Sequence, residues 1–459
     1  MVAGVDFEEA AGKHRAGDPV KSLRFFDRAI VTYDEGLRKF PNSFDLAYNK
    51  ARVQYEVATH PKLAKQLQSP LLDVLRAALS SHDYALKLDE NDADLLFNTS
   101  QVLTSIAEEL ANSGTSHEAI RLLQSALKLQ ARCFSVQQLK YAENLRQQEE
   151  VRQIFENAPA DQSASRDNVP PSDTQTDASS TSDDGQWALV VEPVTIATMA
   201  ETVVACLATM TTLCTTIASS GIEALIAVLP TLADENTELI GKTTSWIFPD
   251  QSPVLDEIRL ADTILKAALL DAAFVFEKLD AETYARELGQ LWDAHRTLQS
   301  SPSALLAHAN ALISFNSSIS TTNSDESLRW TALSTTITAL TNASKLPSIS
   351  AEEKFQTHLL RGDVSLLLCQ LRTRYKPAAS NAAVLLKNAV VFYRNAALLS
   401  MEQEAKDKAS FKAIVAQTLG EKGQVLRGDL EGVKEKLQEM LDDGLLVETV
   451  DDRGETVYT

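Results

Sequence analysis

The sequence is poor in glycine, proline and aromatic residues. Its 459 residues include 16 glycines and 14 prolines, and aromatic side chains make up 6% of the chain. An all-β protein needs many tight turns, which glycine and proline supply. Leucine and alanine are abundant instead, and both lose little conformational freedom in a helix. The composition therefore predicts a helical protein, and its 44% of hydrophobic residues is ample for a packed core.

Cysteine is also scarce. The four cysteines form no C-x-x-C pair, and no histidine stands beside them at zinc-ligand spacing. Cys206 and Cys214 are too far apart on one helix, roughly 12 Å along its axis, to form a disulfide. Such usage is typical of a reducing compartment, and the N-terminus lacks the basic flank and apolar run of a secretory signal. We expect a location in the cytoplasm, and also in the nucleus.

Motifs for catalysis are absent from the sequence. There is no phosphate-binding G-x-x-x-x-G-K-[ST] loop, no G-x-G-x-x-G after a strand, no H-E-x-x-H and no G-x-S-x-G elbow. The seven histidines are scattered, and a lone histidine in a helical protein is more often a packing residue than a catalyst. We therefore expect no catalytic residue, no metal site, no cofactor and no enzymatic activity.

A surplus of positive charge is missing too. The formal net charge is −20, which argues against direct binding to nucleic acid or to an anionic membrane. It favours attraction to a basic protein partner. The alternative is that the acidity only keeps the protein soluble.

One pattern occurs twice, 49 residues apart. The first copy is Ala29-x3-Tyr33-x2-Gly36-Leu37-x3-Pro41, and the second is Ala78-x3-His82-x2-Ala85-Leu86-x3-Glu90. After each copy comes a turn rich in Asn, Ser and Asp, and then a segment with an aromatic residue followed by Asn. Each copy predicts a helix that ends, a short turn and a new helix.

This spacing resembles that of the tetratricopeptide (TPR) family over residues 7–146. The matching positions in the three units are Ala10, Gly17, Ala29, Tyr33 and Pro41; then Asn49, Ala51, Ala78, His82 and Ala85; then Asn98, Ser100, Ala119, Leu123 and Ala126. Gly362 and the later Ala389-x3-Tyr393-x2-Ala396 are similar. The resemblance implies an all-α, TPR-like helical-repeat solenoid. From Ala51 to Ala78 is 27 residues, where a standard unit needs about 12, so the repeats are expected to be irregular.

Composition divides the chain into four regions. Residues 1–155 are the predicted N-terminal repeats, and within them 132–155 are predicted to form a separate helix. Residues 156–188 are predicted to be a disordered acidic linker, because a segment so rich in Ser, Thr and Asp cannot bury enough apolar area to fold. Residues 189–430 are a predicted C-terminal helical-repeat region, with helices at about 221–232 and 234–243 among others. Residues 431–459 are a predicted acidic tail that frays after Leu445.

Residues 202–222 carry no charge. This uncharged run is long enough to cross a membrane as a helix. The run contains eight Thr and Ser residues and has no basic flank. A buried central helix is therefore favoured, and a membrane-associated helix is the alternative. We expect no membrane partner.

The family resemblance places the first helix of each unit on the concave side. The residues expected to line it and to bind a partner are Asp45, Tyr48, Asn49, Arg52, Asp94, Phe97, Asn98 and Gln101. Asn can bond a peptide backbone, aromatic rings can cover apolar stems, and Asp can pair with Lys or Arg. The alternative for Tyr48 and Phe97 is that both belong to the core.

Some TPR proteins hold the acidic tail of heat-shock chaperones in a carboxylate clamp of Lys, Asn and Arg. Asn49 fits that pattern, but the first helix offers Phe7 and Ala11, and the third offers Asp94, which would repel a carboxylate. A heat-shock chaperone tail is therefore not an expected partner.

We expect a non-catalytic protein-binding scaffold, acting as an escort or assembly chaperone for a basic client such as a ribosomal or nuclear protein. The alternatives are an adaptor subunit of a larger complex and a membrane-linked trafficking factor.

Overall fold

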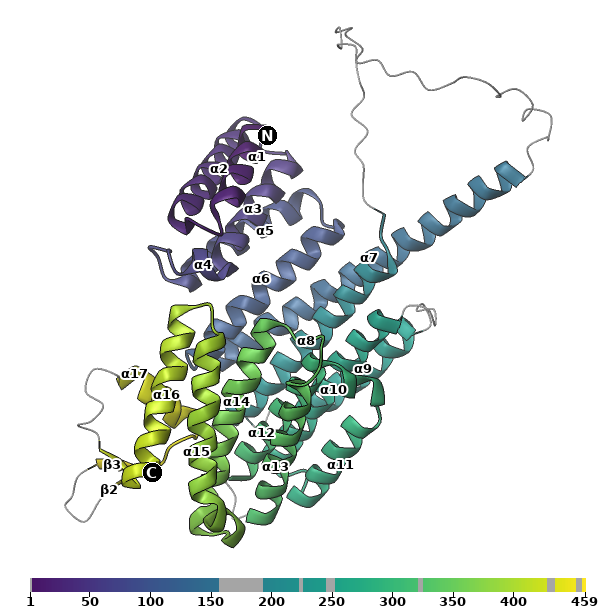
Figure 1. The fold of residues 1–459 in the computed structure, drawn as a ribbon. Coiled ribbons are helices and arrows are strands. Elements are labelled where there is room, and N and C mark those ends of the chain that lie inside the picture. Colours follow the sequence, from purple (N-terminus) through teal and green to yellow (C-terminus); the bar gives the residue numbers. More distant parts are fainter. Residues whose placement is uncertain are drawn as a thin grey trace, which may run out of the picture. The chain divides into compact units, whose positions relative to one another are not determined.

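The computed structural model describes residues 2–156, 193–222, 226–244, 252–320, 325–426, 434–450 and 456–459. Nearly all of these residues are helical, and successive helices pack as pairs (Figure 1). The predicted all-α helical-repeat fold is confirmed. The linker predicted at 156–188 lies outside the described residues from position 157 onward.

The chain divides into two compact units. One contains residues 1–106 and 125–203, and the other contains residues 107–124 and 204–459. The helices of the N-terminal part are α1 (Val2–His14), α2 (Pro19–Lys39), α3 (Phe44–Thr59), α4 (Pro61–Ala64), α5 (Leu71–Leu88), α6 (Ala93–Asn112) and α7 (Ser116–Glu156). Helix α2 packs on α1 and α3, and α5 packs on α3. The long connection predicted between Ala51 and Ala78 contains the short helix α4.

The helices of the remaining chain are α8 (Ile196–Ser220), α9 (Val228–Thr244), α10 (Ser252–Val275), α11 (Ala281–Asp293), α12 (Pro302–Ser320), α13 (Glu326–Ala343), α14 (Ala351–Gln370), α15 (Lys376–Leu399), α16 (Gln403–Lys422) and α17 (Lys434–Asp442). Short 3-10 turns lie at 296–300 and 371–373. A small antiparallel sheet has the strand order β1 (Val425–Leu426), β3 (Thr456–Tyr458), β2 (Glu448–Val450). Its register pairs Val425 with Tyr458 and Thr449 with Val457.

Local chemistry fixes where several helices begin. Asp18 accepts a hydrogen bond from Lys21 N at 2.9 Å, and Pro19 occupies the first turn of α2, where its missing N–H costs no helical bond. Ser350 and Glu353 form a reciprocal capping box at the start of α14, with distances of 2.9 and 3.2 Å. A Ser followed three residues later by Glu is a sequence signature of such a helix start.

The repeat pattern of small and aromatic residues becomes the buried face of α2. Phe26, Ala29 and Tyr33 are buried, and the Ser22 hydroxyl donates to the carbonyl of Ala11 at 2.8 Å. The facing small residue on α1 is therefore Ala11, and the match predicted at Ala10 is wrong. One residue is 100° of helix rotation, which turns Ala10 away from α2.

The same device holds one helix pair in each unit. In the N-terminal unit, a Cβ added to Gly4 would come within 2.5 Å of the Tyr33 ring, so only glycine allows the two helices this approach. The Tyr33 hydroxyl donates to Glu8. Glu8 also pairs with Arg52 of α3, the first helix of the next pair. Tyr33 packs against Gly4 and bonds Glu8, and Glu8 pairs with Arg52. These contacts join α1, α2 and α3.

In the second unit, Tyr393 of α15 packs on Gly362 of α14 in the same way. Its hydroxyl donates to Asp363 Oδ1 at 2.7 Å. The buried Lys412 of α16 pairs with the same oxygen at 2.9 Å and with Asp443 at 3.5 Å. Gly362 and Tyr393 were predicted as repeat positions; the carboxylate and the lysine beside them were not.

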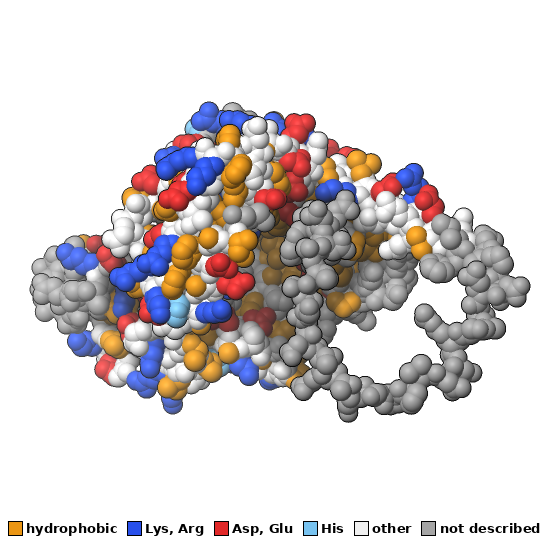
Figure 2. Space-filling model, turned by 90° about the horizontal axis from the view of Figure 1, so that it is seen from above, with side chains coloured by type: hydrophobic (Ala, Val, Ile, Leu, Met, Phe, Trp, Pro, Cys, Tyr) orange, Lys and Arg blue, Asp and Glu red, His pale blue; other side chains and the backbone are white. Residues whose placement is uncertain are grey.

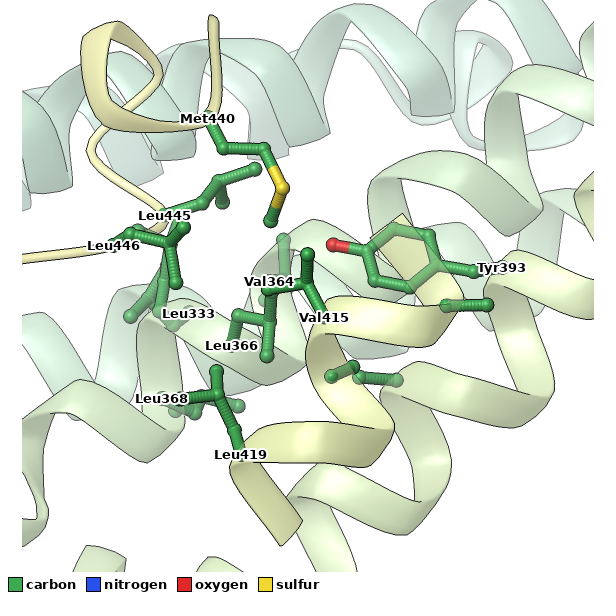
Figure 3. Packing of buried hydrophobic residues seen from close by; sticks show 14 of the residues in the cluster. Leu333, Val364, Leu366, Leu368, Tyr393, Val415, Leu419, Met440, Leu445 and Leu446 are labelled. Atoms are coloured by element: carbon green, nitrogen blue, oxygen red, sulfur yellow. The ribbon is translucent and has the colours of Figure 1, made fainter. Parts of the chain in front are cut away.

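A large hydrophobic core surrounds this second device. Figure 3 shows Leu333, Val364 and Val415 packed with Met440 and Leu445, which come from the C-terminal segment. The prediction that the chain frays after Leu445 is wrong. Leu445 and Tyr458 are both buried in this core, because β2 and β3 bring the last residues back against α14 and α16.

Two other helix boundaries were mispredicted. Residues 132–155 are the second half of α7, which runs for 41 residues, because no glycine or proline interrupts it. The two helices predicted at 221–232 and 234–243 are one helix, α9, from Val228 to Thr244. Pro230 lies in its first turn, where proline is tolerated.

Two described helices are long and apolar enough to cross a membrane by length and composition alone, α8 and α15. Of the most apolar part of α8, 56% is buried inside the protein, whereas the corresponding share in α15 is 28%. Burial of Leu207, Leu213 and Ile217 favours the interpretation of α8 as a core helix.

Replacing Gly362 by alanine is expected to lower the free energy of unfolding by about 1–3 kcal/mol, because the new Cβ would overlap the buried Tyr393 ring. Gly420→Ala in α16 is the matched control, since only Leu386 Cβ lies nearby, at 3.9 Å. That control is expected to raise stability by about 0.5–1 kcal/mol. Urea denaturation of both variants checks this, and equal stabilisation by the two substitutions would contradict it.

A candidate protein-binding surface

The candidate surface lies on α1, α3 and α6, the first helices of three successive pairs. Asp92 caps α6 by accepting from Leu95 N at 2.8 Å, and Asp94 lies in the first turn of the same helix. Asp45 holds the equivalent place in α3, 49 residues earlier. Both Asp45 and Asp94 are exposed. The repeat thus places one exposed carboxylate at the start of α3 and one at the start of α6.

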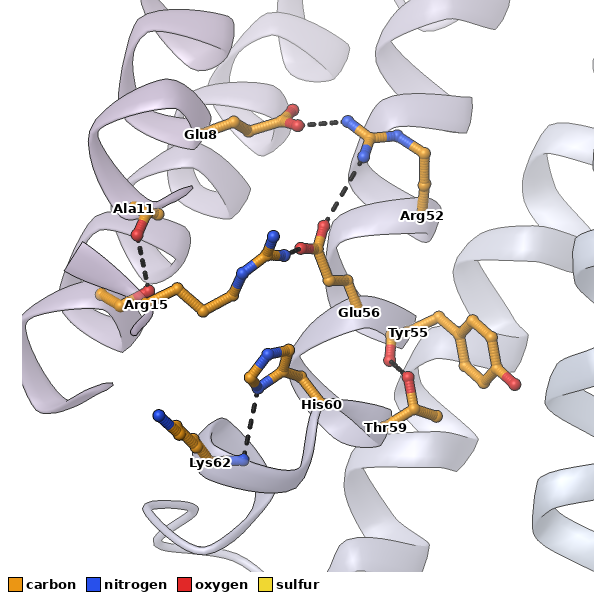
Figure 4. Close-up of polar contacts among 10 residues, drawn as sticks. Glu8, Ala11, Arg15, Arg52, Tyr55, Glu56, Thr59, His60 and Lys62 are labelled. Carbon is orange, nitrogen blue, oxygen red and sulfur yellow. Dashed lines mark hydrogen bonds and ion pairs between the residues drawn. The ribbon is translucent and has the colours of Figure 1, made fainter. Parts of the chain in front are cut away.

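A ladder of ion pairs joins α1 to α3. Arg52 of α3 pairs with Glu8 of α1 and, at 3.7 Å, with Glu56 one turn along its own helix. Arg15, in the turn directly after α1, also pairs with Glu56 (Figure 4). Arg52 was predicted to contact a partner, but its guanidinium is already shared by two carboxylates of the protein. Its first role is therefore to fix α1 on α3.

Tyr48 lies at the centre of a second polar cluster. Asn98 Nδ2 of α6 donates to the Tyr48 hydroxyl at 3.1 Å, and the Phe44 ring stacks on the Tyr48 ring with centroids 5.8 Å apart. Burial, followed by the nearby charges of Asp94 and Asp92, raises the pKa of Tyr48 to about 12. The phenol therefore stays protonated at physiological pH, beside two carboxylates.

The structure therefore brings four of the eight predicted residues into one neighbourhood: Tyr48, Arg52, Asp94 and Asn98. Asn49 and Gln101 are half-buried on the same helices. Phe97 packs in part against Ala93, Leu96 and Cys133, which favours a packing role for its ring. The assignment of all eight residues to partner binding stays a prediction.

Sequence reasoning missed the partners of Arg52. Arg15, directly after α1, follows Glu8 by seven residues, and Glu56 follows Arg52 by four residues on α3. These spacings put each pair on one helix face and could have suggested a ladder. The α1 residues weighed at the sequence level were Phe7 and Ala11, which pack in the hydrophobic core instead.

No group of three or more His, Cys, Asp or Glu side chains among the described residues could hold a metal ion. Burial raises the pKa of the Cys133 thiol to about 11 and that of Cys206 to about 12, so neither is a thiolate nucleophile near neutral pH.

Comparison with known proteins finds sequence similarity over a short part of the chain. No protein-family model matches the chain. UPF0656 protein C926.02 of Schizosaccharomyces pombe is 33% identical over 124 residues, which are 27% of this chain and 27% of that protein. The chain thus spans only about a quarter of the curated relative that it matches.

Two solved structures are similar along most of the chain. A circular tandem repeat protein with novel repeat topology covers 96% of each chain at 13% identity with a TM-score of 0.32. Yeast Tom70 covers 96% of this chain and 99% of its own at 11% identity with a TM-score of 0.19. Scores this low support no argument about function. The packed helix pairs define the fold of this chain as helical repeats, with a polar face on α1, α3 and α6.

Arg52→Met is expected to lower the free energy of unfolding by about 1 kcal/mol, because Glu8 and Glu56 both lose a cation. Arg24→Met on α2 is the control, since Arg24 is exposed on the outer helix. Thermal and urea denaturation at low salt measure both. A loss no larger for Arg52→Met than for Arg24→Met would show that the ladder adds nothing to stability.

Proposed function

We propose that the protein is an escort or assembly chaperone for a basic client, such as a ribosomal or nuclear protein, and that α3 and α6 hold an extended client segment. The observation that carries this proposal is the cluster of Tyr48, Asn98, Asp92 and Asp94. An aromatic ring can cover the apolar stem of a Lys or Arg side chain, and carboxylates can pair with its charge. Asp45 repeats the carboxylate one unit earlier.

The distribution of charge supports long-range attraction from elsewhere in the chain. Residues 156–192 contain eight acidic residues and one basic residue, and residues 434–459 contain eight and three. These two segments hold twelve of the twenty net negative charges. Residues 1–155 are nearly neutral, with 21 acidic and 19 basic residues. We infer that the acidic segments attract the client and that the repeats supply the specific contacts.

The second candidate is an adaptor subunit of a larger complex. The near-neutral N-terminal repeats favour it, as does the surface in Figure 2, where acidic and basic side chains are interspersed among hydrophobic ones. An adaptor would bind its neighbours with little dependence on salt, whereas binding driven by opposite charges weakens as salt rises. Salt dependence therefore separates the two functions.

The test is affinity purification of the full-length protein at low and high salt, with identification of the bound proteins. Basic proteins are expected to dominate at low salt and to be lost at high salt. The double variant Asp45→Asn/Asp94→Asn is expected to bind the main basic protein about tenfold more weakly, the effect of about 1.4 kcal/mol.

The matched control is Glu9→Gln/Asp27→Asn, which removes two exposed carboxylates from other faces of α1 and α2. The escort function is wrong if the main partners are acidic, or if binding is the same at both salt concentrations. If the two double variants weaken binding equally, the loss follows from net charge and not from the position of the carboxylates. That result would contradict the role of α3 and α6.

A further inference from the structure

One part of this acidic chain has no acidic residue at all. Between Asp363 and Glu402, 38 consecutive residues contain five basic residues and no Asp or Glu, although the whole chain has 63 acidic residues. Helix α15 lies entirely within this stretch. Any surface that α15 presents is therefore basic or neutral, in contrast to the rest of the protein.

The outward side of α15 carries a line of exposed apolar residues. Val384, Val391 and Leu398 are seven residues apart and are 57%, 46% and 80% exposed. A seven-residue spacing drifts by only about 20° around a helix, so the three side chains form one line. The opposite side of α15, with Ala389 and Tyr393, is buried against the core.

A line of basic residues runs beside the apolar line. Lys376, Lys387 and Arg394 are eleven and seven residues apart, which places them on one strip of the helix about 60° from Val391. All three are exposed. Because α15 contains no carboxylate, none of these cations has an acidic neighbour on its own helix.

The surface continues onto α16, which packs beside α15 (Figure 1). Arg394 donates to the side-chain oxygen of Gln417 at 2.8 Å, and Gln417 in turn donates to Glu421 at 2.8 Å. Ile414 of α16 is 60% exposed, and Met401 in the turn between the helices is 96% exposed. Exposed apolar residues gathered in this way mark an interaction surface more often than chance.

We propose that the α15 face, defined as Val384, Lys387, Val391, Arg394 and Leu398, binds an acidic amphipathic helix of a partner protein. A heptad line of apolar residues is complementary to the apolar stripe of such a helix, and flanking cations select acidic residues beside that stripe. This partner is opposite in charge to the proposed client. The α15 face and the surface on α3 and α6 are formed by different residues.

Charge complementarity decides among the possible occupants. An antiparallel pair of two α15 helices would bring the basic line of one copy against that of the other, which costs energy. A basic segment would be repelled for the same reason. An acidic amphipathic helix can pack its apolar stripe on the apolar line and pair its carboxylates with the basic line.

The test uses the full-length protein and a fluorescent three-heptad helical peptide with Leu on one face and Glu flanking it. Saturable binding is expected by fluorescence anisotropy, and Lys387→Glu/Arg394→Glu is expected to weaken it by about tenfold or more. The same peptide with Lys in place of Glu is expected to gain affinity when Lys387 and Arg394 are reversed to Glu. Any binding of the Lys peptide to the wild type, at the proposed client surface, is expected to be unaffected by Leu398→Asp. Leu398→Asp is expected to weaken the acidic peptide by a similar factor.

Val31→Asp on α2 is the matched control, because Val31 is 55% exposed and lies far along the chain, and it should leave binding unchanged. Circular dichroism confirms that each variant is folded. The proposal is overturned if the acidic peptide does not bind, if Leu398→Asp weakens binding of the Lys peptide to the wild type, or if Val31→Asp weakens binding of the acidic peptide as much as Leu398→Asp. It is also overturned if Leu398→Asp instead abolishes self-association in sedimentation, or binding to phosphatidylserine vesicles.

Discussion

The close approach of paired helices at a glycine is the constraint on which the repeats depend. Tyr33 on Gly4 and Tyr393 on Gly362 each fill the space that a Cβ would occupy. Each tyrosine then places its hydroxyl on a carboxylate of the facing helix, which holds a cation from the following helix. One packing choice thereby sets both the spacing of a pair and the position of the next helix.

This constraint also shapes the binding surface. Because Glu8 is held by Tyr33 and Arg52, the charged residues between α1 and α3 are mostly paired with one another. Asp45 and Asp94 are exposed and lie at the starts of α3 and α6. The carboxylates proposed to contact a client therefore lie at the starts of α3 and α6, while the ion-pair ladder joins α1 and α3 further along these helices. A rigid frame has little conformational entropy of its own to lose when a partner binds.

Much of the fold was predictable because its signals are local. The small and aromatic stripe at Ala29 and Tyr33 and the capping box at Ser350 depend on residues within one or two turns. Of the candidate surface, the repeat predicted the row that includes Tyr48 and Asn98, which do meet. It did not predict Glu8 and Glu56 as the partners of Arg52, because their meeting depends on the rotation of α1 against α3. Helix rotation also explains why Ala11 faces α2 although Ala10, one residue away, was predicted to do so.

The sequence by itself determined the helices, their pairing and the acidic character of the chain, since each follows from residue spacing and composition. Only the tertiary structure decided what becomes of the last residues and of α15. Leu445 and Tyr458 look like part of a polar tail, yet the core left open by α14 and α16 buries them. Val391 and Leu398 look like core residues, yet they face outward because Ala389 and Tyr393 occupy the buried side of the same helix. The face of a helix that packs against other helices becomes buried, and those other helices are formed by residues far away in the chain.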